Sequence, residues 1–244
     1  MTYRGVISEL ASYSNRADAQ FLQRFFKTGP GQYGEGDVFI GARMGPIRAV
    51  AKKYKGLSLA EIQKLLDTKV HEHRMCGLVM LTLKYPKANV SERQNIYDFY
   101  LKNLYKGRIN NWDLIDVTCP RVVGQHLLDK PKDILYDLAR TEDLWQKRVA
   151  IISTATFINN GDSAVTLDLS KILLSDPHDL IQKAVGWMLR EVGKRCDRQI
   201  LLNFLDDHAH EMPRTMLRYS IEHLPTAQRK HYMALKGQTQ KSYK

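Results

Sequence analysis

The segment Ile181–Val185, which reads Ile-Gln-Lys-Ala-Val, recurs in register along the chain, and this recurrence decides the fold. The lysine at its centre aligns with Arg148, 35 residues earlier, and with Arg218, 35 residues later. Arg74 lies 74 residues before Arg148, which is two steps of about 37, and Asn111 occupies the step between them. Such a period, with one helix pair per unit, is typical of an α-solenoid.

The rest of the chain fits this pattern, because helical segments follow one another with short turns between them. Phe21, Leu22, Phe25 and Phe26 recur at helical spacing and predict a first packed helix over residues 17–27. Ser58 and Glu61 together predict a capping box. Further helices are expected near residues 71–84, 91–105, 110–129, 131–140, 143–159, 163–174, 177–195, 198–210, 213–223 and 226–236.

No credible strand pairing is visible, so the expected fold is an all-α superhelix of antiparallel helix pairs. None of the turns resembles an interdomain linker, and we expect one domain over residues 1–244, with about eight residues of flexible basic tail. Solenoids curve, and their concave face is the usual binding surface. The net charge of +11 and the pI near 9.5 favour a basic groove and an anionic partner.

Several classes of protein are disfavoured by composition. The sequence contains no run of about 18 apolar residues, so no membrane span is expected. Met1–Gly5 lacks the apolar core of a signal peptide. Cys76, Cys119 and Cys196 follow no disulfide or zinc pattern and suggest buried thiols in a reducing cytoplasm. Asp206, Asp207, His208 and His210 form only a weak metal pattern, so no metal site is expected.

Two tryptophan-bearing helices carry the candidate site. Trp112 and Asp116 lie four residues apart, on one face of a helix. About two repeats later, Trp187 and Arg190 follow Lys183 by one and two helical turns. Together with Arg148, which is also in register, these side chains are expected to converge on one concave patch. Taken singly, each has a structural explanation: a packed indole, or an aspartate paired with an arginine.

A basic helix and a glycine-rich segment precede these repeats. The helix from Ile47 to about Tyr54 includes Arg48 and Lys52 and no acidic residue, so it is a candidate phosphate contact as well as a solvated face. Residues 28–37 are the most glycine-rich stretch but lack the phosphate-loop pattern, so a simple connection between helices is favoured. The role of Gly29–Gly36 stays open at this point.

The chemistry of the tryptophan–carboxylate group suggests a substrate. Tryptophan faces attract cations, and a carboxylate in a poorly solvated groove stabilises developing positive charge. An N3- or N7-alkylated purine in DNA is both cationic and linked to phosphates. Its glycosidic bond is already weak, so hydrolysis needs only stabilisation of an oxocarbenium-like sugar and a positioned water. One carboxylate suffices for this.

Four stretches resemble the DNA alkylation repair (AlkD-type) glycosylase family, and the resemblance covers nearly the whole chain in order. They are residues 25–37, 110–116, 184–195 and 212–219. The resemblance implies a HEAT-like solenoid that removes 3-methyladenine and 7-methylguanine from duplex DNA in base excision repair. It implies no metal or cofactor and no base flipping. A monomer in the cytoplasm, near the nucleoid, is the corresponding expectation.

The resemblance also assigns roles. Asp116 matches the family's catalytic carboxylate, and Trp112 and Trp187 match an aromatic pair that flanks the sugar of the lesion. Arg148 matches an arginine of the cleft, and Arg190 a phosphate contact. Lys183, Arg48 and Lys52 are further candidate DNA contacts, from their positions in the repeats. Two alternatives remain: a non-catalytic binder of DNA structure on the same fold, and a protein–protein scaffold.

Overall fold

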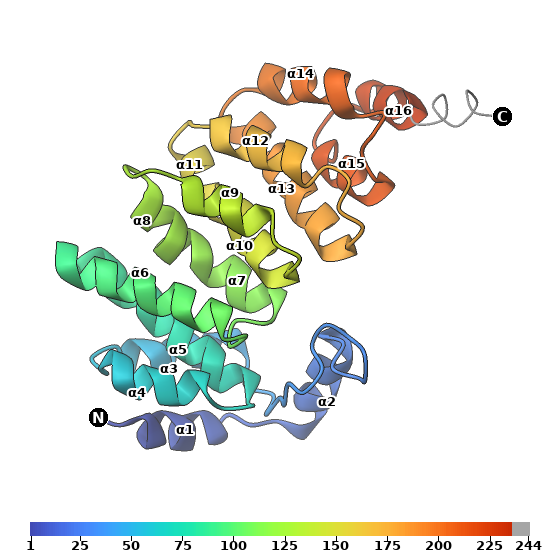
Figure 1. Ribbon diagram of the computed structural model, residues 1–244. Helices are drawn as coiled ribbons and strands as arrows, with labels where there is room; N and C mark the ends of the chain where they lie inside the picture. Colours follow the sequence, from blue (N-terminus) through green and yellow to red (C-terminus); the bar gives the residue numbers. More distant parts are fainter. Residues whose placement is uncertain (236–244) are drawn as a thin grey trace. The chain divides into compact units, whose positions relative to one another are not determined.

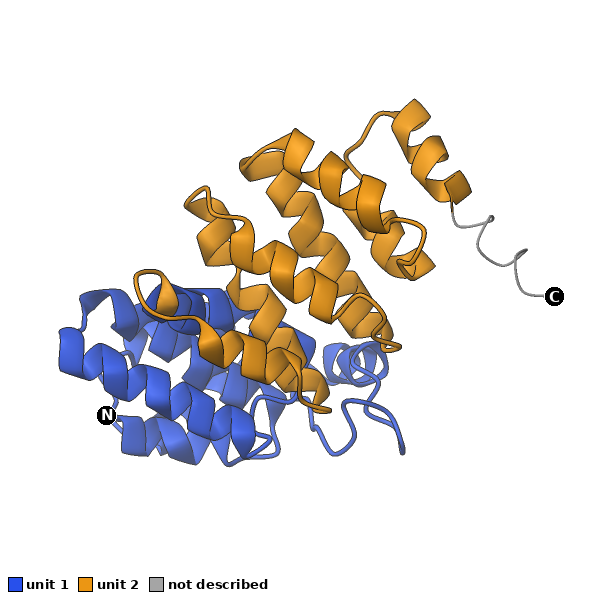
Figure 2. Ribbon diagram, turned by 45° about the horizontal axis from the view of Figure 1, so that its top comes forward, with its two compact units in different colours: residues 1–126 blue, residues 127–244 orange. Residues whose placement is uncertain are grey.

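The computed structural model describes residues 1–235, so the expected basic tail lies outside the described residues. Helices and turns make up this part of the chain, apart from one isolated parallel bridge between Val38 and Val70. The chain divides into two compact units, Met1–His126 and Leu127–Lys244 (Figure 2). No helix within residues 1–235 is long and apolar enough to span a bilayer. The all-helical class predicted from the repeats is therefore confirmed.

Unit 1 is built around α5 (Figure 1). Every residue of α5 from His71 to Thr82 is buried, because α1, α3, α4 and α7 all pack against this helix. The elements of unit 1 are α1 (Tyr3–Ala11), α2 (Arg16–Phe25), α3 (Met44–Lys53), α4 (Leu59–Leu66), α5 (His71–Lys84), the 3-10 turn η1 (Tyr85–Lys87), α6 (Val90–Tyr105), α7 (Trp112–Cys119) and the π-helical turn η2 (Pro120–Gly124).

Unit 2 is built around α13, which packs against five other helices. The short helix α8 (Gln125–Leu127) spans the division between the units. The elements of unit 2 are α9 (Asp133–Ala139), α10 (Leu144–Ser153), α11 (Ala155–Asn159), α12 (Ala164–Ile172), α13 (Asp179–Arg195), α14 (Arg198–His208), α15 (Arg214–Ser220) and α16 (Thr226–Leu235).

The contact between α13 and α15 is the most extensive between two helices of residues 1–235, and Gly186 permits it. A Cβ atom at Gly186 would lie 2.4 Å from the carbonyl oxygen of Met216 and 2.6 Å from the Cβ of Tyr219. No side chain fits such a gap, so the glycine sets how closely the two helices approach.

The helix starts of unit 2 confirm the period of 35 residues, but unit 1 departs from the common register at α7 and by one residue at α5, where Arg74 is the fourth residue. Arg148, Lys183 and Arg218 are each the fifth residue of their helices, α10, α13 and α15. The fifth residue of α7 is Asp116, whereas Asn111 is the residue that caps α7. The sequence placed Asn111 in that register because equal steps were assumed, but α7 begins later than equal steps require. The candidate carboxylate therefore occupies the position that carries a cation in unit 2.

Two local expectations also differ from the structure. The first concerns α2, which ends at Phe25 instead of residue 27 and has no buried residue. Phe21 and Phe25 are 50% and 52% exposed, and of the four apolar residues only Phe26, after the helix, is buried. The second concerns the capping box. Ser58 does accept the backbone N–H of Glu61, but the Glu61 carboxylate binds the backbone N–H of Tyr3 and the ammonium of Lys64 instead.

Candidate functional site

Trp112 begins α7 and is held at its first turn. The buried side chain of Asn111 accepts the backbone N–H of Trp112 at 2.9 Å, which satisfies one of the donors left open at a helix start. Trp112 is half-buried, and Asp116, one turn later on the same face, is half-buried too. The structure thus places the predicted indole–carboxylate pair together on one short helix.

Aromatic rings pack against the indole of Trp112 and restrict its orientation. The Trp112 and Phe26 rings stack with centroids 5.1 Å apart and planes 26° apart. Phe26 in turn stacks on Phe39 at 5.1 Å, and Phe39 on His71 at 4.5 Å. Phe25 meets Trp112 edge-on at 5.9 Å and leaves half of its own surface exposed. This stack leaves the indole few alternative orientations.

A buried ionic network lies beneath the aromatic rings. His71 places Nδ1 3.1 Å from Asp37 and Nε2 2.8 Å from Asp113. Arg74 pairs with Asp37 at 2.5 Å and donates to the side chain of Asn110 at 2.5 Å. Two cations thus meet two carboxylates, which is the balance that a buried cluster needs. Asp113 connects the network to the first turn of α7, next to Trp112.

The protonation of this network follows from its geometry. Burial alone lowers the pKa of His71, but the charge and hydrogen bond of Asp113, with the bond to Asp37, raise that pKa to about 9. Burial raises the pKa of Asp37, yet the hydrogen bond from His71 and the charge of Arg74 bring it below its ordinary value. His71 is therefore an imidazolium at neutral pH.

The glycine-rich segment serves this network. The backbone N–H of Gly34 donates to the carbonyl of Lys27 at 3.1 Å, which folds the segment back over α2. A Cβ at Gly34 would lie 2.4 Å from the Phe26 carbonyl oxygen, so only glycine fits there. The segment then delivers Asp37 to His71. The expected connection between helices is thus confirmed, and it places Asp37 beside His71.

The remaining candidates of unit 1, Arg48 and Lys52, lie on α3. They are four residues apart and both are exposed. Within residues 1–235 neither forms an ion pair with a carboxylate. The Arg48 guanidinium and the Lys52 ammonium are therefore both available to an anion. The sequence predicted this arrangement from the absence of acidic residues in the helix.

Unit 2 holds the other candidates, on α10 and α13. Arg148 is buried and donates to the Leu180 carbonyl at 2.6 Å, which ties the two helices together. Lys183 pairs with Asp179 at 2.6 Å, one turn earlier. Trp187 is half-buried on α13, one turn after Lys183.

Arg190 is more constrained than the sequence suggested. Its guanidinium pairs with Glu222 and lies 3.4 Å from a carboxylate oxygen of Glu191. Glu191 is itself bound by Arg195 at 2.7 Å. Two carboxylates therefore neutralise the side chain that was expected to contact a phosphate. Its place on α13 near Trp187 follows from the sequence, and Glu191 is the next residue on the same helix. Glu222 lies in the turn after α15, 32 residues away, and was not predictable from spacing.

Two side chains of the weak metal pattern near the end of α14, Asp206 and His210, contact other residues. Asp206 accepts the hydroxyl of Tyr232 at 2.7 Å, and His210 faces Glu211 at 3.1 Å. No group of three His, Cys, Asp or Glu side chains is placed to hold a metal ion within residues 1–235. None of the three cysteines, all within residues 1–235, forms a disulfide; Cys76 and Cys119 are buried as expected, whereas Cys196 is half-buried. Burial raises the pKa of Cys76 to about 12.

Sequence reasoning missed the residues that support α7: Asp37, His71, Arg74 and Asp113. The available signal was a run of charged and histidine side chains at the start of a helix with apolar residues on every side. In the sequence, His71 and His73 lie two residues apart and do not share a helix face, so as a pair they predict no site. The partners of His71 lie 34 and 42 residues away.

Comparison with known proteins agrees with this architecture. A solved structure described as a predicted DNA alkylation repair enzyme from Enterococcus faecalis has a TM-score of 0.68 and 16% sequence identity, and the match covers 87% of this chain and 97% of that one. The likeness shows the fold, which is of the α-solenoid class. No curated protein matches the chain. A family model described as DNA alkylation repair enzyme matches residues 6–224, across both units. The chain belongs to the DNA alkylation repair enzyme family.

Proposed function

We propose that this protein is a DNA glycosylase that hydrolyses the N-glycosidic bond of N3- and N7-alkylated purines in duplex DNA. The single observation that carries the proposal is the placement of Trp112 and Asp116 one turn apart on α7, with the indole braced by Phe26. An indole face and a carboxylate on a rigid support suit a cationic substrate. The family, which is one of alkylation repair enzymes, supports the same substrate class.

The proposed reaction needs no proton on the leaving base. An alkylated purine is already positive, so it leaves as a neutral base with the electron pair of the C1′–N bond. The sugar becomes oxocarbenium-like, and the Asp116 carboxylate stabilises it by charge. Water then attacks C1′ and loses a proton to Asp116 or to solvent. In this scheme the base keeps its place in the duplex, since the group that acts on it approaches the sugar.

The other candidates take supporting roles in the proposal. In the proposal Trp112 lies against the sugar, and Trp187 and Lys183 are DNA contacts of unit 2. Arg148 is buried and bound to the Leu180 carbonyl, so it supports α13 and does not contact the DNA backbone. Arg48 and Lys52 bind phosphates further along, and Arg190 contributes least because Glu191 and Glu222 already neutralise it. Phosphate contacts of this kind dominate affinity and make it fall with salt.

Release of 7-methylguanine from methylated duplex DNA tests the proposal, with the Asp116→Asn variant run beside the wild type. Release by the wild type and a loss of about a hundredfold or more in the variant, with unchanged DNA affinity, are expected for a carboxylate that acts only in the transition state. Release at equal rates would remove Asp116 from the mechanism. Salt-sensitive binding with no release from either protein would replace the glycosylase with a non-catalytic DNA binder.

A further inference from the structure

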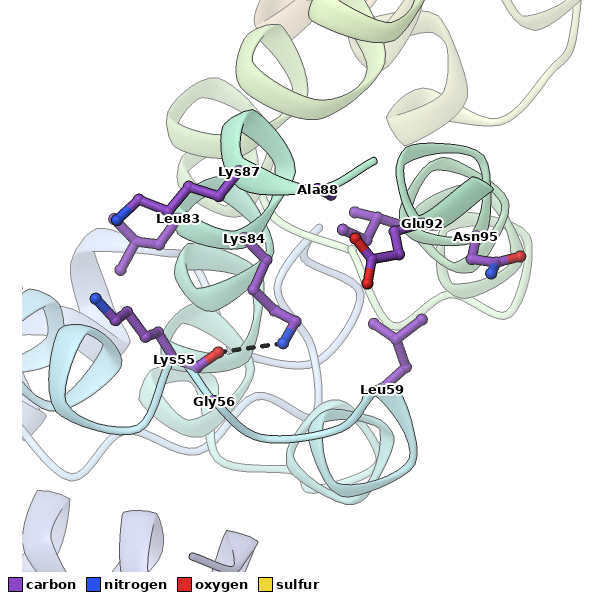
Figure 3. A pocket seen from close by; sticks show the side chains of 10 residues that line it. Lys55, Gly56, Leu59, Leu83, Lys84, Lys87, Ala88, Glu92 and Asn95 are labelled. Carbon is purple, nitrogen blue, oxygen red and sulfur yellow. Dashed lines mark hydrogen bonds between the residues drawn. The ribbon is translucent and has the colours of Figure 1, made fainter. Parts of the chain in front are cut away.

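A cavity of about 450 Å³ lies at the far end of unit 1 from Trp112. It is formed by the turn between α3 and α4, the last residues of α5, and the start of α6 (Figure 3). His71 begins α5, and the cavity begins at Leu83 near its end, so the length of the helix separates the cavity from the ionic network. Fourteen helical residues span roughly 21 Å. The cavity is therefore distinct from the proposed glycosylase site.

Its floor is apolar and its edge is cationic. Leu59, Leu83 and Ile96 supply the apolar surface. Lys55, Lys84 and Lys87 also line the cavity, and Glu92 is the one acidic residue among the lining side chains. Three ammonium groups against one carboxylate leave a net positive charge beside a surface that water solvates poorly.

The lysines differ in how they are held. Lys84 donates to the carbonyl oxygens of Lys55 and Leu57 at 3.2 and 3.0 Å, which anchors its ammonium at the cavity (Figure 3). An ammonium has three N–H donors, so one remains for a ligand. Within residues 1–235, Lys55 and Lys87 form no ion pair with a carboxylate. All three can therefore meet an anion.

The acidic residue is held in place by α6. One carboxylate oxygen of Glu92 accepts the backbone N–H of Asn89 at 2.9 Å, as part of a capping box. This capping bond holds the Glu92 carboxylate near the cavity, where its negative charge opposes the binding of an anion. Asn95, on the next turn, places an amide at the cavity with no hydrogen bond to another residue in the range 1–235, and it offers a donor and an acceptor.

We propose that this cavity binds a small phosphate monoester with a compact apolar ring system, of the size of a nucleoside monophosphate. The lysine ammonium groups at the cavity bind the dianion, and the ring covers the apolar surface of Leu59, Leu83 and Ile96. The Asn95 amide meets the polar edge of the ring. The volume is within the range of small-molecule sites. Inorganic phosphate would leave the apolar floor exposed to water, and an uncharged nucleoside would leave the lysines without a partner.

Calorimetric titration of the DNA-free protein tests this independently of the glycosylase proposal. The probes are adenosine monophosphate, adenosine and inorganic phosphate. Adenosine monophosphate is expected to bind at least about tenfold more tightly than either fragment, because it uses both the apolar floor and the charges. Absence of binding, or equal affinity for the nucleotide and one of its fragments, would overturn the proposal.

Three variants make the assignment specific. Lys87→Ala is expected to weaken nucleotide binding about fivefold, whereas Lys102→Ala, an equal loss of charge on exposed α6 surface outside the cavity, leaves it unchanged. Glu92→Gln preserves the capping function, because glutamine serves in capping boxes, and removes the opposing charge. It is expected to tighten binding about threefold. Equal effects of Lys87→Ala and Lys102→Ala, or weaker binding by Glu92→Gln, would place the ligand elsewhere.

Discussion

The Nε2 atom of His71 lies 2.8 Å from Oδ2 of Asp113, the residue that follows Trp112. The other ring nitrogen lies 3.1 Å from Asp37, so one imidazolium joins the glycine-rich segment, α5 and α7. These contacts are buried, and removal of one partner would leave an uncompensated charge. The orientation of Trp112 therefore depends on the protonation of a residue that does not touch the proposed substrate.

The first prediction concerns pH and stability. The pKa of His71 is about 9 in the folded protein and about 6.5 unfolded, so folding favours the protonated form. Its contribution, on the order of 3 kcal/mol, is fully present below pH 6.5 and is lost as the pH rises through 9. Urea denaturation between pH 6.5 and 8.5 should show the free energy of unfolding falling with pH, and His71→Gln should remove that slope.

The matched control for this slope is His73→Gln. Burial lowers the pKa of His73 to about 4, so its titration affects stability only below pH 6.5 and leaves the alkaline slope intact. Measurements stop at pH 8.5 because Cys76, whose pKa burial raises to about 12, ionises from pH 9 in the unfolded chain. A His71→Gln slope equal to that of the wild type would mean that His71 is neutral in the folded protein.

The second prediction concerns the ring beneath Trp112. Phe26→Leu removes a stacked ring 5.1 Å from the indole and should slow release of 7-methylguanine about tenfold, because Trp112 then samples other orientations. DNA affinity should stay near that of the wild type. The readout is the single-turnover rate at saturating enzyme, which separates positioning from binding.

Phe21→Leu provides the control for this change. Phe21 is half-exposed, stacks on Phe25 and does not reach Trp112 in the described contacts, so its replacement should leave the single-turnover rate unchanged. Equal losses in Phe26→Leu and Phe21→Leu would mean that aromatic surface on α2, and not the support of Trp112, determines the rate.

Period and patterning predicted much of the fold, since helix starts at Leu144, Asp179 and Arg214 follow from repeated local signals. The pair Trp112 and Asp116 was also predictable, because four-residue spacing on a helix is a local property. The network around His71 was not, since it joins three segments that only the packed unit brings together. Of the two carboxylate partners of Arg190, Glu222 was not predictable for the same reason, since it is 32 residues away.

The third prediction concerns the closest helix approach in unit 2. Gly186→Ala places a Cβ 2.4 Å from the Met216 carbonyl, which is backbone and cannot rotate away. Separation of α13 from α15 should cost about 3 kcal/mol of unfolding free energy, at the upper end for overpacked sites. Urea denaturation measures this. Gly45→Ala is the control, because nothing lies within 4 Å of a Cβ there. Equal stability of both variants would show that α15 moves away from α13 without loss of unfolding free energy.

The fourth prediction separates the proposed phosphate contacts by salt. A cation that meets a phosphate releases a counterion, so its removal lowers the slope of log affinity against log salt by about 1. Arg48→Ala and Lys52→Ala should each produce this change, since both side chains are exposed and neither has a carboxylate partner within residues 1–235. Arg190→Ala should change the slope much less, because Glu191 and Glu222 already balance its charge. Fluorescence anisotropy on a duplex at several salt concentrations gives all three slopes. A full unit lost in Arg190→Ala, with none in Arg48→Ala, would place the DNA backbone along α13 and away from α3.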